Sequence, residues 1–425
     1  MWHTVTSISS LLLGTAILLL GNGLLGTTVG TRAGIAGWSP GMVSTVMSAY
    51  FVGFIIGSLT LPALIHRVGH IRTFAALAAL AAATALGFVL VHEPGVWLVL
   101  RALGGFSVMG LYMTIESWLN ALAPPERRGR VFGIYMTVNL GALGCAQGLL
   151  LLAPLDSDLP FLLVTIFLAL AVLPVALTRV NEPTRIEPAR LSFAGLFDAP
   201  LPGLVSAGLV GLTLGGFWGM GPLFAQRIGL DNSGVAAFMA ATILGGALLQ
   251  WPIGMLSDRF DRRLVLAGAA FGAALLSVLA RLAVGAPLHW LILPMLGFGG
   301  LAFSLYSITV AYLNDAVEPA RALQAARSML LVNGLGAALG PLAAGYFMER
   351  FGSANMPVYA ATICTLLALF MTLQLRRSPP PHPHGRFIAS ARTSPVAMDL
   401  DPRLGEAAQA EPPEPDAPPA TAPTV

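Results

Sequence analysis

Long runs of apolar residues alternate with short polar segments along most of this chain. A helix needs about 20 mostly apolar residues to cross the hydrocarbon core of a bilayer. The pattern predicts twelve such helices, at about residues 6–28, 41–64, 73–92, 96–120, 131–153, 160–178, 201–225, 234–256, 264–283, 289–312, 327–348 and 357–375. The first run has neither a charged segment before it nor a cleavage site after it, so we interpret it as a membrane helix rather than a signal peptide. The chain is therefore predicted to be an all-α integral membrane protein.

The longest polar interruption, residues 179–200, separates six of these spans from the other six. It predicts an N-terminal half over residues 1–178, a cytoplasmic linker over 179–200 and a C-terminal half over 201–376. The tail, residues 377–425, is rich in Pro, Ala and acidic residues and has no apolar period. Such a composition cannot bury enough apolar surface to fold, so the tail is predicted to be disordered and cytoplasmic.

The two halves repeat each other in sequence. The segment Y-x6-L-N that begins at Tyr112 returns 194 residues later, at Tyr306. Arg67 and Arg259 are 192 residues apart, and both lie between a pair of spans. Internal duplication of this kind is typical of secondary transporters.

Composition excludes a soluble protein. Hydrophobic residues make up 56% of the chain, charged residues only 10%, and the mean hydropathy is +0.77, whereas soluble domains carry about 25% charged residues. The net charge of +3 is too small and too scattered for nucleic-acid binding. Cys145 and Cys364 each lie in an apolar run and are expected to be buried small side chains without a disulfide.

Arginine placement predicts the orientation in the membrane. Fourteen arginines fall on one side of the predicted spans and three, Arg32, Arg227 and Arg350, on the other. Because cytoplasmic loops carry the excess of basic residues, both termini are predicted to be cytoplasmic. The fourteen are Arg67, Arg72, Arg127, Arg128, Arg130, Arg179, Arg185, Arg190, Arg259, Arg262, Arg263, Arg321, Arg376 and Arg377.

Motifs between the spans resemble those of the major facilitator superfamily. Residues 254–263 (GMLSDRFDRR) are similar to its signature G-x-L-[AS]-D-R-x-x-R-[RK]. The equivalent segment 62–72 (PALIHRVGHIR) keeps Arg67 and Gly69 but has Pro62 and His66 where the signature has Gly and Asp. Residues 125–133 (PERRGRVFG) and 101–105 (RALGG) also resemble family motifs, and the likeness covers about residues 6–376. The altered first motif and residues 116–118 (ESW) resemble those of a poorly characterised bacterial branch of the family.

This resemblance implies two six-helix halves around a central cavity, working by alternating access in a bacterial inner membrane. Spans 1, 4, 7 and 10 would line the cavity, and spans 2, 5, 8 and 11 would form the contact between halves. The resemblance also implies a monomer and a cytoplasmic gate. The residues expected in the gate motif are Arg67, Gly69, Arg72, Gly254, Asp258, Arg259 and Arg262.

Charge inside a span is costly and marks a functional site by default. Glu116 is either a gate residue, a proton-coupling acid, or a solvated carboxylate. As a gate residue it would pair with a loop arginine, which is Arg67, Arg72, or one of Arg127, Arg128 and Arg130. Arg101, in the same span, either serves the cavity or a proton relay, or extends its charge to the membrane surface. The two lie 15 residues apart, about 22 Å along a helix, so they cannot pair.

Neutral polar and aromatic residues are expected to form the substrate site. The candidates are Asn22, Tyr112, Gln147, Trp218 and Tyr306, although polar residues also join packed helices in membranes. His3, His66 and His70 are read as loop residues too dispersed to hold a metal, and no cofactor motif or catalytic pair is present.

The sequence therefore predicts a transporter, not an enzyme. Its expected partners are the lipid bilayer, a small-molecule substrate and protons, with export slightly favoured. The alternatives are an importer or uniporter of the same fold and a non-transporting sensor or scaffold.

Overall fold

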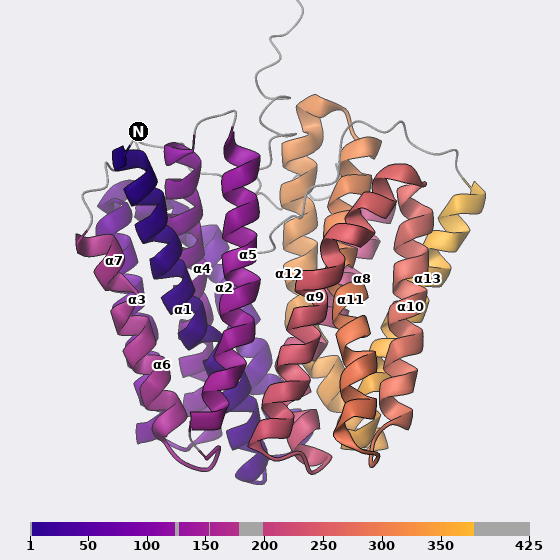
Figure 1. Cartoon of the computed structure of the whole chain (residues 1–425), viewed down its shortest axis with the longest axis horizontal. Helices are drawn as coiled ribbons and strands as arrows, with labels where there is room; N and C mark the ends of the chain where they lie inside the picture. Colours follow the sequence, from indigo (N-terminus) through magenta and orange to yellow (C-terminus); the bar gives the residue numbers. More distant parts are fainter. Residues whose placement is uncertain (1, 124–126, 153, 178–198, 378–425) are drawn as a thin grey trace, which may run out of the picture.

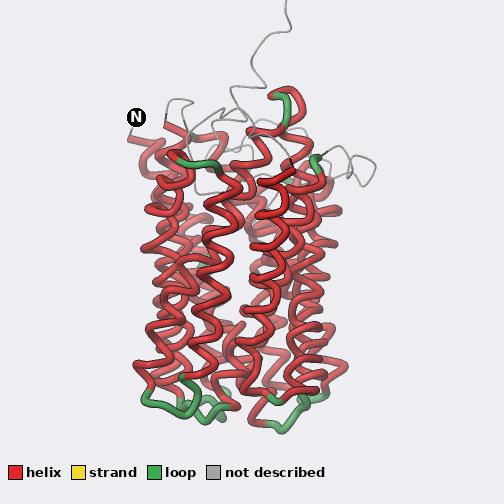
Figure 2. The backbone as a smooth tube through the Cα atoms, turned by 90° about the vertical axis from the view of Figure 1, so that its right-hand side faces the viewer, coloured by secondary structure: helices red, strands yellow, loops and turns green. Residues whose placement is uncertain are grey.

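The computed structural model describes residues 2–123, 127–152, 154–177 and 199–377, and these ranges contain helices and no strands. Helices α1–α7 stand beside helices α8–α13 as two groups (Figure 1). The helices run along a common direction, and their connections gather at the two ends of the bundle (Figure 2). Twelve spans in the described ranges are long and apolar enough to cross a membrane, which confirms the predicted number. The predicted tail and nearly all of the predicted linker lie outside the described residues.

The first group contains α1 (Trp2–Ile35), α2 (Pro40–Val68), α3 (His70–Leu90), α4 (Pro94–Leu122), α5 (Arg128–Gly148), α6 (Leu159–Leu170) and α7 (Val172–Leu177). The second contains α8 (Leu201–Arg227), α9 (Asn232–Arg259), α10 (Arg262–Leu282), α11 (Leu288–Ala316), α12 (Pro319–Phe351) and α13 (Met356–Arg377). Short 3₁₀ turns, η2 (Leu149–Leu152) and η4 (Ser353–Asn355), follow α5 and α12.

The sixth span is broken into α6 and α7 at Ala171. Pro174 lies inside this span and has no N–H to donate to the carbonyl of residue 170, and its ring crowds that carbonyl. The backbone N–H of Ala171 still bonds the Phe167 carbonyl at 2.9 Å. The break therefore follows from a proline that the apolar pattern does not register.

Several helices extend beyond the predicted apolar runs. Helix α2 continues through His66 to Val68 and ends at Gly69, whose φ of 93° favours glycine. His3, His66 and His70 were wrongly predicted to lie in loops, since all three are helical. An apolar run locates the hydrocarbon core, whereas a helix continues through the interface until a residue ends it.

The two halves, which repeat each other in sequence, also repeat the same packing between helices. An ideal Cβ on Gly53 (α2) would lie 1.8 Å from the Ala102 carbonyl oxygen of α4, and one on Gly245 (α9) would lie 1.8 Å from the Leu296 oxygen of α11. Gly53 and Gly245 are 192 residues apart, and Ala102 and Leu296 are 194 apart. Small residues let membrane helices approach closely, so both halves use the same glycine-mediated crossing.

We expect Gly245→Ala to lower the thermal stability of the purified protein strongly. The added methyl group would overlap the Leu296 carbonyl, and overpacking typically costs about 1–3 kcal/mol. Gly268→Ala in α10 is the matched control, because no heavy atom lies within 4 Å of the Cβ it would add. Melting curves in detergent should separate the two, and equal melting temperatures would contradict the crossing.

The two halves contact each other at the end of the bundle where α1 ends and α2 begins. Ser48 of α2 donates a hydrogen bond to the Ala338 carbonyl of α12. Arg227, the last residue of α8, donates to the Trp38 carbonyl at 2.9 Å. These bonds join the halves on one side of the membrane midplane.

Candidate substrate cavity

A cavity of about 260 Å³ lies between the two halves. Eight helices line it, α1, α2, α4 and α5 from one half and α8, α9, α11 and α12 from the other. The resemblance predicted α1, α4, α8 and α11 as the lining and the other four as the contact between halves. All eight in fact reach the cavity, so the helices expected to form the contact between halves also contribute to its wall.

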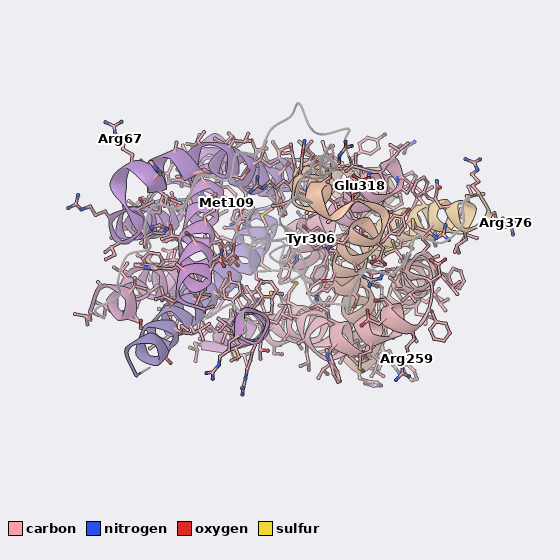
Figure 3. All side chains as sticks on the ribbon, turned by 90° about the horizontal axis from the view of Figure 1, so that it is seen from above. Arg67, Met109, Arg259, Tyr306, Glu318 and Arg376 are labelled. Carbon is pink, nitrogen blue, oxygen red and sulfur yellow. The ribbon has the colours of Figure 1, made fainter. Side chains whose placement is uncertain are left out.

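Four of the five predicted site residues lie on the cavity wall, namely Asn22, Tyr112, Trp218 and Tyr306. In Figure 3 Tyr306 lies near the centre of the molecule and Met109 of the opposite half also lies toward the middle. The fifth, Gln147, is fully buried between α5 and α1, where its side-chain oxygen accepts a hydrogen bond from Thr27 at 2.8 Å. Thr27 itself lines the cavity, so Gln147 contacts a residue of the cavity wall without lining the cavity itself.

Aromatic rings form one apolar surface of the cavity. Trp218 of α8 and Phe303 of α11 stack with their centroids 5.7 Å apart and their planes 27° apart. Phe51 and Phe54 of α2 line the cavity on the side of the N-terminal half. Such walls bind flat or amphipathic solutes through burial and ring contacts.

Arg101 points into the same cavity from α4. Its side chain is only 6% exposed, and its guanidinium carbon lies 4.6 Å from the centre of the Tyr50 ring. The side chain therefore does not extend to the membrane surface. The motif predicted a role for Arg101, whereas nothing in the sequence distinguished Tyr50 from other aromatic residues in the spans.

Glu116 is fully buried in α4 and accepts a 2.6 Å hydrogen bond from the Tyr135 hydroxyl of α5. Arg67, one of its predicted partners, extends away from the bundle (Figure 3). Tyr135 is itself fully buried and was not predicted. The pair joins α4 to α5 within the N-terminal half, beside the cavity residue Tyr112.

The C-terminal gate motif forms a charge cluster around the buried Arg262. Arg262, at the start of α10, lies 3.6 Å from Asp258 and 2.8 Å from Asp315 of α11. Asp315 was not predicted, although it directly follows the repeated Y-x6-L-N segment. Arg259 is exposed and lies at the edge of the bundle (Figure 3).

Asp261, in the connection between α9 and α10, pairs with Arg263 at 2.7 Å. Burial raises the pKa of Asp261, but hydrogen bonds from the Arg263 side chain and backbone outweigh it, so the pKa lies below its ordinary value. A lowered carboxyl pKa stabilises the folded state at neutral pH. That contribution is lost as the pH falls through the lowered pKa.

The N-terminal copy of this cluster has a histidine at the position that corresponds to Arg262. His70 stands 192 residues before Arg262, and its Nε2 lies 2.8 Å from the Ser117 hydroxyl of α4. The His70 ring also lies 5.8 Å from the Trp118 ring. His70 of the altered segment 62–72 thus joins α3 to α4 through a contact with Ser117, whereas Arg262 joins α10 to α11 through a salt bridge with Asp315.

We expect Asp315→Asn to destabilise the protein by about 3–5 kcal/mol, because breaking a buried ion pair leaves an uncompensated charge. The side chains of Arg262 and Asp315 are only 6% and 8% exposed. Asp156→Asn, at an exposed position, serves as the control. A melting temperature of Asp315→Asn equal to that of the control would show that Asp258 alone neutralises Arg262.

Comparison with known proteins agrees with this architecture. Residues 11–200 and 203–407 match the family model described as Major Facilitator Superfamily. An uncharacterized MFS-type transporter of Enterobacter sp. (strain 638) is 29% identical, and the uncharacterized MFS-type transporter YcaD of Salmonella typhi is 28% identical. Each alignment covers 88% of this chain and 97% of the relative.

Solved structures show the same fold at low identity. The nucleoside transporter NupG superposes with a TM-score of 0.69 at 16% identity, over 87% of this chain and 99% of that one. The D-xylose-proton symporter superposes with a TM-score of 0.67 at 16% identity, over 90% and 99%. Together with the family match over both halves, this shows that the chain belongs to the major facilitator superfamily and is a multi-pass transmembrane transporter rather than an enzyme.

Proposed function

We propose that this transporter couples movement of a small organic molecule to protons and works by alternating access. The observation that carries the proposal is a cavity between two duplicated halves that are joined at one end. A rocking motion that opens this contact and closes the opposite end would expose the same cavity to the other side.

The orientation supports an inward-facing state. The arginine asymmetry favours cytoplasmic termini in a bacterial inner membrane. The contact made by Ser48 and Arg227 then lies on the outer side, and the cavity lies on the cytoplasmic side of it. This is the arrangement that one state of an alternating-access cycle requires.

Glu116 is the proposed proton carrier. It is a fully buried carboxyl group whose neighbour Tyr135 donates to it at 2.6 Å. A charged carboxylate in a membrane span is costly, so a buried carboxyl group favours the protonated form. When the transporter changes conformation and water reaches the group, it can release that proton. We place Arg101 at the substrate rather than on the proton path, because it contacts the cavity and Tyr50.

The test is proton movement in proteoliposomes with a pH-sensitive dye inside, challenged by neutral, cationic and anionic solutes. We expect one class of solute to drive a saturable proton flux. Solute flux without proton flux would favour a uniporter. Imposing the proton gradient in each direction would show whether export, the favoured direction, or import occurs.

A sensor or scaffold remains the alternative of another class, and the tail separates the two. A transporter truncated after Arg377 should keep its flux, whereas a sensor that signals through the tail should lose its output. A truncated protein that has lost flux while it remains folded would count against the proposal.

A further inference from the structure

We propose that the cavity binds an organic monoanion, a single carboxylate carried on a small apolar or aromatic body, with Arg101 as the ligand of the carboxylate. The inference rests on the proposed function, because it takes the cavity to be the transport site. It adds the chemical class of the substrate and the side chain that recognises it.

The Arg101 guanidinium has hydrogen-bonding capacity left over. Its Nε is buried and has no hydrogen-bond partner. One side of the guanidinium faces the Tyr50 ring, and Nη2 lies 3.7 Å from the place where a Cβ on Gly26 would stand. A cation–π contact satisfies none of the five N–H donors of an arginine. The donors therefore remain available to an acceptor that enters the cavity.

The charge of Arg101 is also uncompensated within the cavity. Of the described residues that line it, Arg101 alone carries a charge, and none is acidic. An unpaired cation in a low-dielectric interior is costly, and a pair of opposite charges with good geometry recovers part of that cost. A planar carboxylate matches the guanidinium in a two-point hydrogen bond.

The other residues of the cavity wall indicate what kind of molecule carries the carboxylate. Apart from Arg101, the wall consists of aliphatic, methionine and aromatic side chains, glycines, and neutral polar residues, which are Asn22, Thr27, Ser58, Asn139, Gln250 and Asn333. The stacked pair Trp218 and Phe303 offers a flat apolar surface. A dianion would need a second cation, which the described lining does not provide, so a monoanion fits best.

Gly26 provides a sharp test of this geometry. An aspartate there would place a carboxylate beside Arg101, in open space apart from Nη2. We expect Gly26→Asp to occupy the anion site from within the protein, while Gly26→Asn fills the same volume without charge. Gly26→Asp should therefore lose anion binding and melt at a higher temperature than Gly26→Asn.

The probe is benzoate, compared with neutral benzamide and cationic benzylamine, with indole-3-acetate as a larger carboxylate. Binding to the detergent-solubilised full chain would be followed by tryptophan fluorescence and thermal shift. We expect a carboxylate to bind the wild type and to bind at least tenfold more weakly to Arg101→Gln and Gly26→Asp. Arg281→Gln is the control, because Arg281 bonds Asn355 away from the cavity at 2.6 Å.

Several results would overturn the inference. Benzamide or benzylamine binding as tightly as the carboxylates would do so, as would carboxylate binding to Gly26→Asp that equals binding to Gly26→Asn. Failure of both carboxylates to bind the wild type would do so as well. If Arg101→Gln fails to fold, the Gly26 pair still decides, because it keeps Arg101 in place.

The proton assay distinguishes this failure from failure of the proposed function. Proton-linked flux of a neutral or cationic solute that is insensitive to Arg101→Gln would leave the proposed function standing and reject the monoanion. Carboxylate binding that depends on Arg101 but moves no protons would support the monoanion and reject proton coupling.

Discussion

Replacing Glu116 with Gln is expected to lower substrate-driven proton flux at least tenfold while the protein remains folded. Glutamine has nearly the volume of glutamate and keeps an oxygen that can accept the 2.6 Å bond from Tyr135, but it cannot bind or release a proton. The loss should therefore appear in coupling rather than in folding. The measurement is internal pH in proteoliposomes together with flux of the same solute.

Two further variants serve as controls for Glu116→Gln. Glu93→Gln alters the exposed residue before the first turn of the same helix, α4, and should leave proton flux unchanged. Tyr135→Phe removes the hydroxyl that bonds Glu116 but keeps the titratable carboxyl group, so coupling should persist. Proton flux in Glu116→Gln that matches the wild type would assign Glu116 to the gate between conformations.

The number and type of helices could be predicted because a membrane span has a sequence signal of its own. About 20 apolar residues are needed whatever the fold around them. Helix ends carry a weaker signal, as α2 shows by continuing past its apolar run to Gly69. The break at Ala171 depends on Pro174, whereas Pro252 and Pro341 lie inside continuous helices. A helix continues through a proline where neighbouring helices or side chains satisfy the backbone groups whose hydrogen bond the proline removes.

The candidate site could be predicted only in part, for a related reason. Arg101 and Glu116 stand out because charge is rare and costly in a span. Tyr50 and Tyr135 do not, because aromatic residues occur both in the interior and at the lipid surface. Trp251, also in a span, is 68% exposed, whereas Tyr135 is fully buried. Which rings meet the charged groups depends on how helices pack, and a single sequence does not contain that information.

Joining α5 to α9 across the two halves is expected to stop transport almost completely. A Cβ on Gly144 would lie 3.8 Å from Cγ2 of Ile243. Helices α5 and α9 therefore pass closely enough here for a small adjustment to bring two cysteines to the Cβ separation of about 3.5–4.5 Å in a disulfide. Gly144→Cys with Ile243→Cys should therefore form a bond that fixes the contact between halves. Cys145, which was wrongly predicted to be buried, is exposed, and it is changed to Ser in this background so that it cannot compete.

The control is a disulfide within one half. Gly208→Cys with Val332→Cys joins α8 to α12, where the corresponding Cβ–Cγ1 distance is 3.4 Å, and it should leave flux largely intact. A half that moves as a rigid body tolerates an internal bond, whereas alternating access requires α5 and α9 to separate. Reduction should restore transport in the first pair, which distinguishes locking from damage. Undiminished flux in the fully oxidised Gly144 and Ile243 pair would mean that substrate passes without separation of the halves at this contact.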